Sequence, residues 1–225
     1  DIDPTAVNFK SGDSLLVSVI GRSNQNVYLQ DSTGRFYAVP SHTLPSARGQ
    51  GEPASGKLNL PAGATLTGMI MGEDDKEVFV GTSAGYGFRT TIADLHTKNK
   101  AGKSVVKISP YAQVVQPKLI YDDNSLIVAV SNEGRMLVFD ISNVPNLVKG
   151  KGNKIINIPS ARLKRGEEWV VDYAIVGQGT SLLVYSGKRY LSLKYGDLEH
   201  YIGERGRRGH KLPRGFQRVD YLKSE

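Results

Sequence analysis

A short unit that recurs four times constrains the fold of this chain more than any other feature. Each copy has an apolar approach segment, a tight turn that contains glycine, and a second run of β-prone residues. The copies read STGRFYAV from Ser32, SAGYGFRT from Ser83, NEGRMLVF from Asn132 and SGKRYLSL from Ser186; their turn glycines are Gly34, Gly85, Gly134 and Gly187, at spacings of 51, 49 and 53 residues. Because β-branched and aromatic residues flank each turn, every copy predicts a β-hairpin.

The length of the repeat predicts an all-β array of blades set around an axis, because one small sheet cannot bury both of its faces alone. We predict a single domain over residues 1–225, with a lead-in at 1–13 where a first blade is incomplete. The repeats are expected at 14–68, 69–120, 121–176 and 177–225. In the first repeat, the strands are predicted at LLVSVI from Leu15, VYLQ from Val27 and RFYAV from Arg35.

The composition fits a folded domain and excludes several classes of site. The 225 residues are 39% hydrophobic and 23% charged, which suits a chain that buries a core. With no cysteine, the chain has no disulfides, thiolate metal sites or cysteine nucleophiles. No apolar run reaches the roughly 18 residues of a membrane span, so we expect a soluble or at most peripheral protein. The start at Asp1, without methionine, predicts a piece cut from a longer polypeptide.

Basic residues concentrate at one phase of the repeat, in a chain of net charge +7. A basic or glycine-rich loop follows each hairpin glycine at a nearly constant distance, and we align these loops on Gly49, Gly102, Gly150 and Gly203. If rotation relates the blades, these loops form a band around one rim. The candidate contacts are Arg48 and Lys57 in the first loop, Lys98, Lys100 and Lys103 in the second, Lys149, Lys151 and Lys154 in the third, and Arg205, Arg207, Arg208, Lys211 and Arg214 in the fourth.

Cationic side chains beside glycines suit a polyphosphate backbone, because glycine lets main-chain amides approach closely while Lys and Arg neutralise phosphates. For any one loop, the alternative is a solvated loop whose charge confers only solubility. Three basic loops at the same phase of the repeat favour binding of a polyanion over a role in solubility alone. Stacking of single strands needs exposed aromatic residues, and only Tyr201 and Phe216 lie near these loops, so duplex DNA is favoured.

Other motifs argue against a catalytic or cofactor site. The segment Lys100–Ser104 is not a nucleotide phosphate loop, because Thr97 stands where glycine is needed and SVVKI, from Ser104, predicts a strand rather than a helix. The four histidines lack metal-ligand spacing. Trp169, the only tryptophan, is expected to pack in the core. We therefore predict no catalytic residue, metal or cofactor in this chain.

Four longer stretches resemble the C-terminal DNA-binding domains of bacterial type IIA topoisomerases. They are TLPSARGQGEPASGKL from Thr43, AGYGF from Ala84, KGKGNKIINIPSA from Lys149 and GERGRRG from Gly203. The likeness is closer to the topoisomerase IV branch (ParC) than to the gyrase branch. It implies a β-pinwheel, a propeller-like, five-bladed disc of hairpin-exchanging blades that is broken rather than closed, with DNA on its basic perimeter.

The resemblance also implies a role within a larger enzyme. The domain would bind and bend double-stranded DNA and present a transfer segment for decatenation and relaxation, which the ATP-hydrolysing ParE and the rest of ParC perform with Mg²⁺. It implies a cytoplasmic, nucleoid-associated location. For the parent enzyme, a peripheral position at the inner membrane is an alternative. The gyrase heptad QRRGGKG is absent, and ARGQGEP from Ala47 and ERGRRGH from Glu204 are the nearest strings, so tight wrapping is not expected.

Two other functions are weighed against DNA binding. A propeller could serve as a protein-interaction scaffold whose basic rim meets an acidic, condensin-type chromosome organiser. An enzyme in its own right is the third hypothesis, and no sequence pattern favours it.

Overall fold

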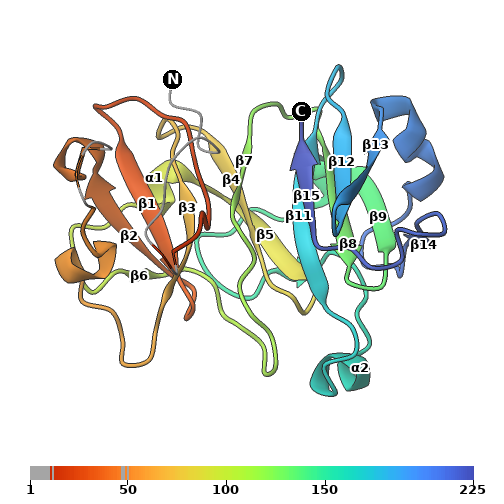
Figure 1. The fold of residues 1–225 in the computed structure, drawn as a ribbon, viewed down its shortest axis with the longest axis horizontal. Coiled ribbons are helices and arrows are strands. Elements are labelled where there is room, and N and C mark those ends of the chain that lie inside the picture. The colour runs from red at the N-terminus through yellow and green to blue at the C-terminus, as the bar shows by residue number, and fades with distance from the viewer. Residues whose placement is uncertain (1–10, 12, 47–48, 50) are drawn as a thin grey trace.

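The computed structural model describes residues 11, 13–46, 49 and 51–225, and it has the all-β architecture that the repeat predicts (Figure 1). The strands of the described residues form four antiparallel sheets. In spatial order, sheet one is β3 (Leu66–Ile70), β1 (Asn26–Asp31), β2 (Arg35–Pro40) and β6 (Lys103–Ser104). Sheet two is β10 (Asn153–Lys154), β5 (Tyr86–Thr91), β4 (Glu77–Gly81) and β7 (Lys118–Ile120). Sheet three is β11 (Val170–Val176), β8 (Leu126–Ser131), β9 (Arg135–Asp140) and β14 (His210–Lys211), and sheet four is β13 (Arg189–Leu193), β12 (Leu182–Ser186) and β15 (Tyr221–Ser224).

The helices are short and lie in the connections. The α-helices are α1 (Ile92–Leu95) and α2 (Ser160–Lys164), and the 3-10 helices are η2 (Ser41–Thr43), η3 (Ala54–Lys57), η4 (Ile141–Asn143) and η5 (Tyr195–Tyr201). In α1, the Thr91 side chain accepts a hydrogen bond from the Asp94 backbone N–H, which caps the first turn. None of the helices in the described part of the chain combines the length and apolar character that crossing a membrane requires.

Neighbouring repeats exchange strands. In sheets one, two and three the outermost strand comes from the following repeat: β6 pairs with β2, β10 with β5, and β14 with β9. Each of these donated strands has only two residues. In these three sheets the hairpins that the sequence predicts are therefore central, and one repeat depends on the next for its outer edge.

The repeated turn glycine is required by this exchange. Gly34, Gly85 and Gly134 have φ values of +86°, +89° and +75°, which disfavour residues with a Cβ. A Cβ on Gly85 would also lie 2.3 Å from the carbonyl oxygen of Ile156, in the segment that arrives from the next repeat. Each of these three copies of the motif thus marks the point where one repeat crosses another. Gly187 has φ +60° but open space around it.

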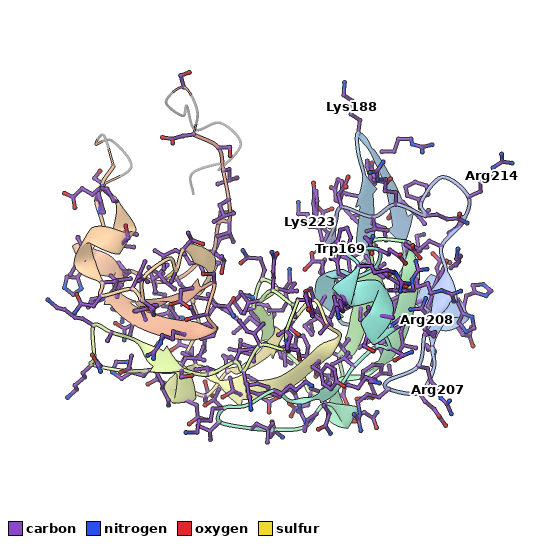
Figure 2. All side chains as sticks on the ribbon, turned by 90° about the horizontal axis from the view of Figure 1, so that it is seen from below. Trp169, Lys188, Arg207, Arg208, Arg214 and Lys223 are labelled. Carbon is purple, nitrogen blue, oxygen red and sulfur yellow. The ribbon has the colours of Figure 1, made fainter. Side chains whose placement is uncertain are left out.

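Apolar clusters fill the spaces between successive sheets. Sheets one and two share a cluster that includes Phe36 and Phe88, and sheets two and three share one that includes Phe79 and Tyr173. Sheets three and four share a third cluster, with Val184 at its sheet-four side. Figure 2 shows the four sheets following one another around an arc, with sheets one and four on separate arms. Among the described residues, no strand pairing joins these two arms, so the disc is open.

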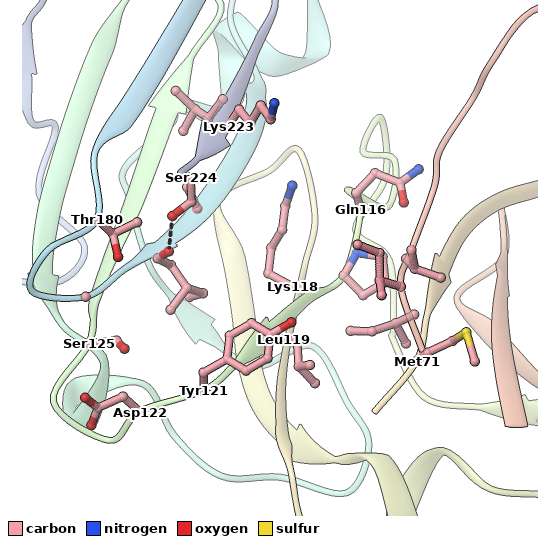
Figure 3. Close-up of a pocket in the computed structure, with 18 of the residues that line it drawn as sticks. Met71, Gln116, Lys118, Leu119, Tyr121, Asp122, Ser125, Thr180, Lys223 and Ser224 are labelled. Atoms are coloured by element: carbon pink, nitrogen blue, oxygen red, sulfur yellow. Dashed lines mark hydrogen bonds between the residues drawn. The ribbon is translucent and has the colours of Figure 1, made fainter. Parts of the chain in front are cut away.

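The inner strands β3, β7, β11 and β15 border a hollow of about 1090 Å³ (Figure 3). On its wall, Lys118 Nζ lies 3.1 Å from the buried Asp172 carboxylate, and the Leu222 backbone N–H donates to the same carboxylate at 2.9 Å. Burial raises the pKa of Asp172, and the nearby Lys118 charge opposes that rise. These contacts join strands of sheets two, three and four.

Two sequence predictions about strands are wrong. The run LLVSVI, from Leu15, forms no strand, because no neighbouring backbone pairs with it; Leu16 and Ile20 are 69% and 93% exposed. In the predicted strand SVVKI, only Ser104 belongs to a strand, β6, and Val106 makes an isolated bridge to Gly150. The lead-in at 1–13 lies almost entirely outside the described residues.

Candidate nucleic-acid interface

Main-chain hydrogen bonds join the basic loops into one continuous surface. The Asn59 N–H donates to the Lys100 carbonyl at 2.9 Å, which links the first loop to the second. Lys107 N–H donates to the Gly150 carbonyl at 2.8 Å, which links the second to the third, and Gly150 N–H donates back to Val105. The third and fourth loops are joined in the same way, with Asn157 N–H donating to the Arg207 carbonyl and Gly206 N–H donating to the Ile155 carbonyl. We call this surface, residues 57–59, 96–107, 147–157 and 203–211, the basic belt.

The donated strands place a lysine on the belt in three of the four repeats. Lys103, Lys154 and Lys211 belong to β6, β10 and β14, which are the outermost strands of successive sheets. Lys154 and Lys211 sit at equivalent positions, because they pair with the residues that directly follow the turn glycines, Tyr86 and Arg135. The strand exchange therefore repeats a cation along the arc.

The pairing register of the donated strands corrects the alignment of the basic loops that was made from the sequence. Gly102, Gly152 and Gly209 each directly precede a donated strand and have φ values of +77°, +79° and +74°. A Cβ on Gly152 would lie 2.2 Å from the Gly87 carbonyl oxygen of the preceding sheet. Gly102 therefore corresponds to Gly152 and Gly209, and the alignment with Gly150 and Gly203 is wrong, because loop lengths before the donated strand differ between repeats.

Several of the predicted cations are without protein partners. Within the described residues, the side chains of this group make no hydrogen bond, ion pair or ring contact with other protein groups: Lys98, Lys100, Lys149, Lys211 and Arg214. Arg214 lies outside the belt, in the loop that follows β14 (Figure 2). These five side chains can reach a phosphate without first breaking a protein contact.

The other predicted cations have protein partners. Lys103 Nζ donates to the Asp94 carbonyl at 2.5 Å, Lys154 Nζ to Asn157 Oδ1 at 3.2 Å, and Lys57 Nζ to the Thr43 carbonyl at 2.6 Å. The remaining contacts are those of Lys151 with the Tyr86 ring, Arg205 with the Lys154 carbonyl, Arg207 with Glu204, and Lys57 with Glu52. Arg48 lies outside the described residues.

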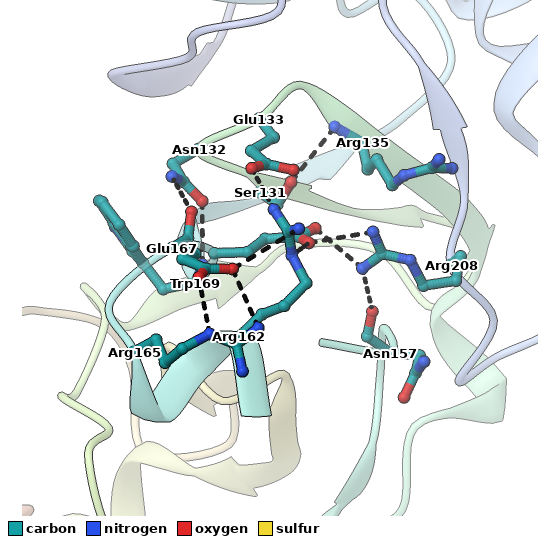
Figure 4. Close-up of polar contacts among 11 residues, drawn as sticks. Ser131, Asn132, Glu133, Arg135, Asn157, Arg162, Arg165, Glu167, Trp169 and Arg208 are labelled. Atoms are coloured by element: carbon teal, nitrogen blue, oxygen red, sulfur yellow. Dashed lines mark hydrogen bonds and ion pairs between the residues drawn. The ribbon is translucent and has the colours of Figure 1, made fainter. Parts of the chain in front are cut away.

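Arg208 differs from its neighbours because its guanidinium is bound to a buried carboxylate (Figure 4). Its two terminal nitrogens lie 2.8 and 3.0 Å from the two oxygens of Glu168, which is 0% exposed, and Nη1 also donates to the Asn157 carbonyl at 2.9 Å. From α2, Arg162 Nε donates to Glu168 at 3.1 Å, and Arg162 also pairs with Glu133. The network ties the fourth loop to sheet three.

The protonation of Glu168 follows from this network. Burial alone would raise the pKa of Glu168, but the hydrogen bonds and charge of Arg208, with smaller contributions from Ser131 and Arg162, hold that pKa below its ordinary value. Glu168 is therefore ionised at neutral pH. Glu168 lies 40 residues before Arg208 and outside the fourth loop, so counting charges within that loop missed it.

The structure also shows the environments of two aromatic residues that the sequence analysis named, and one of them differs from prediction. Trp169 is 39% exposed, so the expectation of core packing is wrong; its neighbours Glu168 and Val170 are buried, and alternation along the chain turns the indole outward. Hydrogen bonds of 2.9 and 3.0 Å between the Trp169 backbone and Asn132 hold the segment in place. Tyr201, one of the two aromatic residues near the basic loops, is buried at 7% exposure.

Comparison with known proteins gives consistent matches. The family model described as DNA gyrase C-terminal domain, beta-propeller, matches residues 76–120 and 125–175. The solved C-terminal domain of E. coli ParC is 47% identical, with a TM-score of 0.84 over 100% of this chain and 91% of that one. The chain belongs to the family of ParC C-terminal domains. Within this family, the A subunit of DNA topoisomerase 4 from Pseudomonas aeruginosa is 50% identical over 99% of this chain.

Two further comparisons set the limits of the family likeness. The DNA gyrase A C-terminal domain shares the fold, with a TM-score of 0.73 at 16% identity, over 94% of this chain and 69% of that one. The chain spans only 30% of the length of the Pseudomonas aeruginosa protein. The β-pinwheel that the sequence resemblance implied is confirmed.

Proposed function

We propose that this chain binds duplex DNA along the basic belt and bends it around the arc, as a non-catalytic part of a type IIA topoisomerase. The observation that carries the proposal is the series of main-chain hydrogen bonds that joins the basic loops of all four repeats edge to edge. Phosphates of a duplex recur along a regular path, and a belt with cations in successive repeats follows such a path.

The residues fall into three groups in this proposal. The partner-free cations of the belt, Lys98, Lys100, Lys149 and Lys211, make the main phosphate contacts, and Arg214 extends them into the loop that follows β14. A second group exchanges weak protein contacts for phosphate: Lys57, Lys103, Lys151, Lys154, Arg205 and Arg207. Arg208 instead positions the fourth loop through Glu168, and Arg48 remains a proposed contact of the first loop.

Binding around the arc requires the duplex to curve. Bending 20–30 base pairs by 40–90° costs on the order of 1–6 kcal/mol, which additional phosphate contacts must offset. The open disc supplies those contacts only along its outer edge. The bent segment would be presented to the cleavage core of the parent enzyme, where ParE and the rest of ParC would carry out decatenation and relaxation with ATP and Mg²⁺.

The salt dependence of affinity tests the belt directly. If about five cations engage phosphates, a plot of log affinity against log salt has a slope of roughly −4 to −5. The assay is fluorescence anisotropy of a labelled duplex at several salt concentrations. A slope near zero would contradict phosphate binding. The comparisons give no support to a chromosome-organising protein as the partner of the belt. That alternative would be favoured if the chain did not bind DNA at any salt concentration.

Charge reversal locates the contacts. Lys149→Glu with Lys154→Glu should weaken duplex binding at least tenfold and by the same factor for unrelated sequences, because phosphate contacts do not read bases. The control, Lys164→Glu with Lys194→Glu, changes the net charge equally but lies off the belt. Equal losses in the two variants would mean that net charge, rather than the belt, binds DNA.

A further inference from the structure

Sheet four lacks the outer strand that completes the other three sheets. In the described residues, β13 pairs only with β12, whereas β2, β5 and β9 each receive a donated strand on the corresponding edge. A Cβ on Gly187, at the tip of the β12–β13 hairpin, would have no atom within 4 Å, unlike one on Gly34, Gly85 or Gly134. Sheet four is thus the last sheet of the arc that the described residues form.

The outward face of this sheet bears a row of three tyrosines. Tyr190, Tyr185 and Tyr221 come from the adjacent strands β13, β12 and β15 and are direct cross-strand neighbours. The ring centroids of Tyr185 and Tyr221 are 4.4 Å apart with an angle of 11° between planes, and those of Tyr185 and Tyr190 are 5.7 Å apart. The side chains at the two ends stay open, with Tyr190 59% and Tyr221 48% exposed.

The opposite end of the arc is covered. On the far face of sheet one, Val27, Leu29 and Tyr37 are buried, with Leu58 and Met71 among the side chains packed over them. On sheet four, the inward residues Val184 and Leu222 reach the core, so alternation along the strands turns Tyr185 and Tyr221 away from it. The aromatic row of sheet four is thus exposed, whereas the corresponding face of sheet one is covered by its own side chains.

Cations flank this row. Lys188, at the tip of the hairpin, is exposed, and Lys223 lies on the same face of β15 as Tyr221 (Figure 2). Lys223 is 56% exposed and pairs with Glu225 at 2.6 Å, a contact at the surface that costs little to exchange. We call Tyr185, Tyr190, Tyr221, Lys188 and Lys223 the tyrosine surface.

We propose that the tyrosine surface binds single-stranded DNA. Aromatic side chains on adjacent strands of a sheet stack with unpaired bases, and lysines at the edges neutralise the accompanying phosphates. A duplex keeps its bases paired and cannot offer them to Tyr190 and Tyr221. The tyrosine surface is therefore a second nucleic-acid site, distinct in residues and in preferred substrate from the basic belt.

The test measures binding of a labelled oligothymidine of about 12 nucleotides to the 225-residue chain by fluorescence anisotropy. Tyr190→Leu and Tyr221→Leu should each weaken binding about tenfold, since leucine is apolar but cannot stack. Tyr190→Phe and Tyr221→Phe retain the ring and should bind within about twofold of the wild type. Tyr121→Leu removes a tyrosine that is 76% exposed elsewhere and is the matched control.

A duplex probe measured in parallel separates this proposal from belt binding. The leucine variants should bind duplex like the wild type, and Lys149→Glu with Lys154→Glu should lose duplex while keeping oligothymidine. The proposal is overturned if the wild type does not bind oligothymidine, if the leucine variants bind it unchanged, or if the phenylalanine variants lose as much affinity as the leucine variants. Far-ultraviolet circular dichroism confirms that each variant is folded.

Discussion

Arg207 and Arg208 are adjacent in sequence, and the structure predicts opposite consequences of replacing them. Arg208 holds Glu168, which is fully buried, through two hydrogen bonds of 2.8 and 3.0 Å. Among the described residues, the Arg207 side chain pairs with Glu204 alone, and the two side chains are 74% and 80% exposed. We therefore expect Arg208→Leu to reduce stability and Arg207→Leu to reduce duplex affinity.

The size of the effect follows from burial. Removing one partner of a buried ion pair costs about 3–5 kcal/mol, because the other charge stays buried without compensation. The Arg208 side chain is 31% exposed and Arg162 remains bonded to Glu168, so we expect about 2–3 kcal/mol for Arg208→Leu. In a chain of this length, each kcal/mol shifts Tm by about 2–4 °C, which predicts a decrease of roughly 4–12 °C.

Calorimetry and duplex anisotropy on the same two variants test this reasoning. Arg207→Leu should leave Tm within about 2 °C of the wild type, since exposed ion pairs contribute little. Adding Glu168→Gln to Arg208→Leu should recover about 1 kcal/mol, because a neutral amide needs no counter-charge. If Arg208→Leu melts like the wild type and loses as much duplex affinity as Arg207→Leu, then the buried network does not have the role assigned to it.

Three further predictions concern the repeat glycine, pH and the tryptophan. Gly85→Ala should lower the free energy of unfolding by at least about 2 kcal/mol, because its Cβ would meet the Ile156 carbonyl oxygen at positive φ. Gly187→Ala, which has open space around its Cβ, should lower it by about 1 kcal/mol. Urea unfolding midpoints compare the two variants, and equal losses would contradict the argument that Gly85 marks a crossing of two repeats. The lowered pKa of Glu168 contributes stability that is present above the ordinary glutamate pKa and lost as pH falls through the lower folded-state value. The wild type should therefore lose its Tm advantage over Glu168→Gln upon acidification, and an advantage that persists at low pH would contradict this. Acrylamide should quench the emission of Trp169, whereas a core tryptophan would resist quenching.

The sequence alone determined the parts of this protein that depend on nearby residues. The turn glycines Gly34, Gly85, Gly134 and Gly187 need positive φ, and the apolar runs beside them need a pleated surface, so both leave a local pattern. The four hairpins could therefore be predicted, whereas the alignment of Gly102 with Gly150 and Gly203 was wrong because loop lengths differ between repeats. The run LLVSVI shows the limit of that pattern, because a β-prone segment becomes a strand only when another backbone pairs with it.

Only the tertiary structure decided which partners these segments meet. Arg208 and Glu168 are 40 residues apart, and the donated strands pair across repeats, so no local pattern distinguishes Arg208 from the exposed Arg207. The exposure of Trp169 and of the tyrosine surface likewise depends on which sheet face receives a neighbour. Packing between repeats determines which side chains are buried, exposed or ion-paired, because burial and ion pairing depend on contacts between residues distant in the sequence.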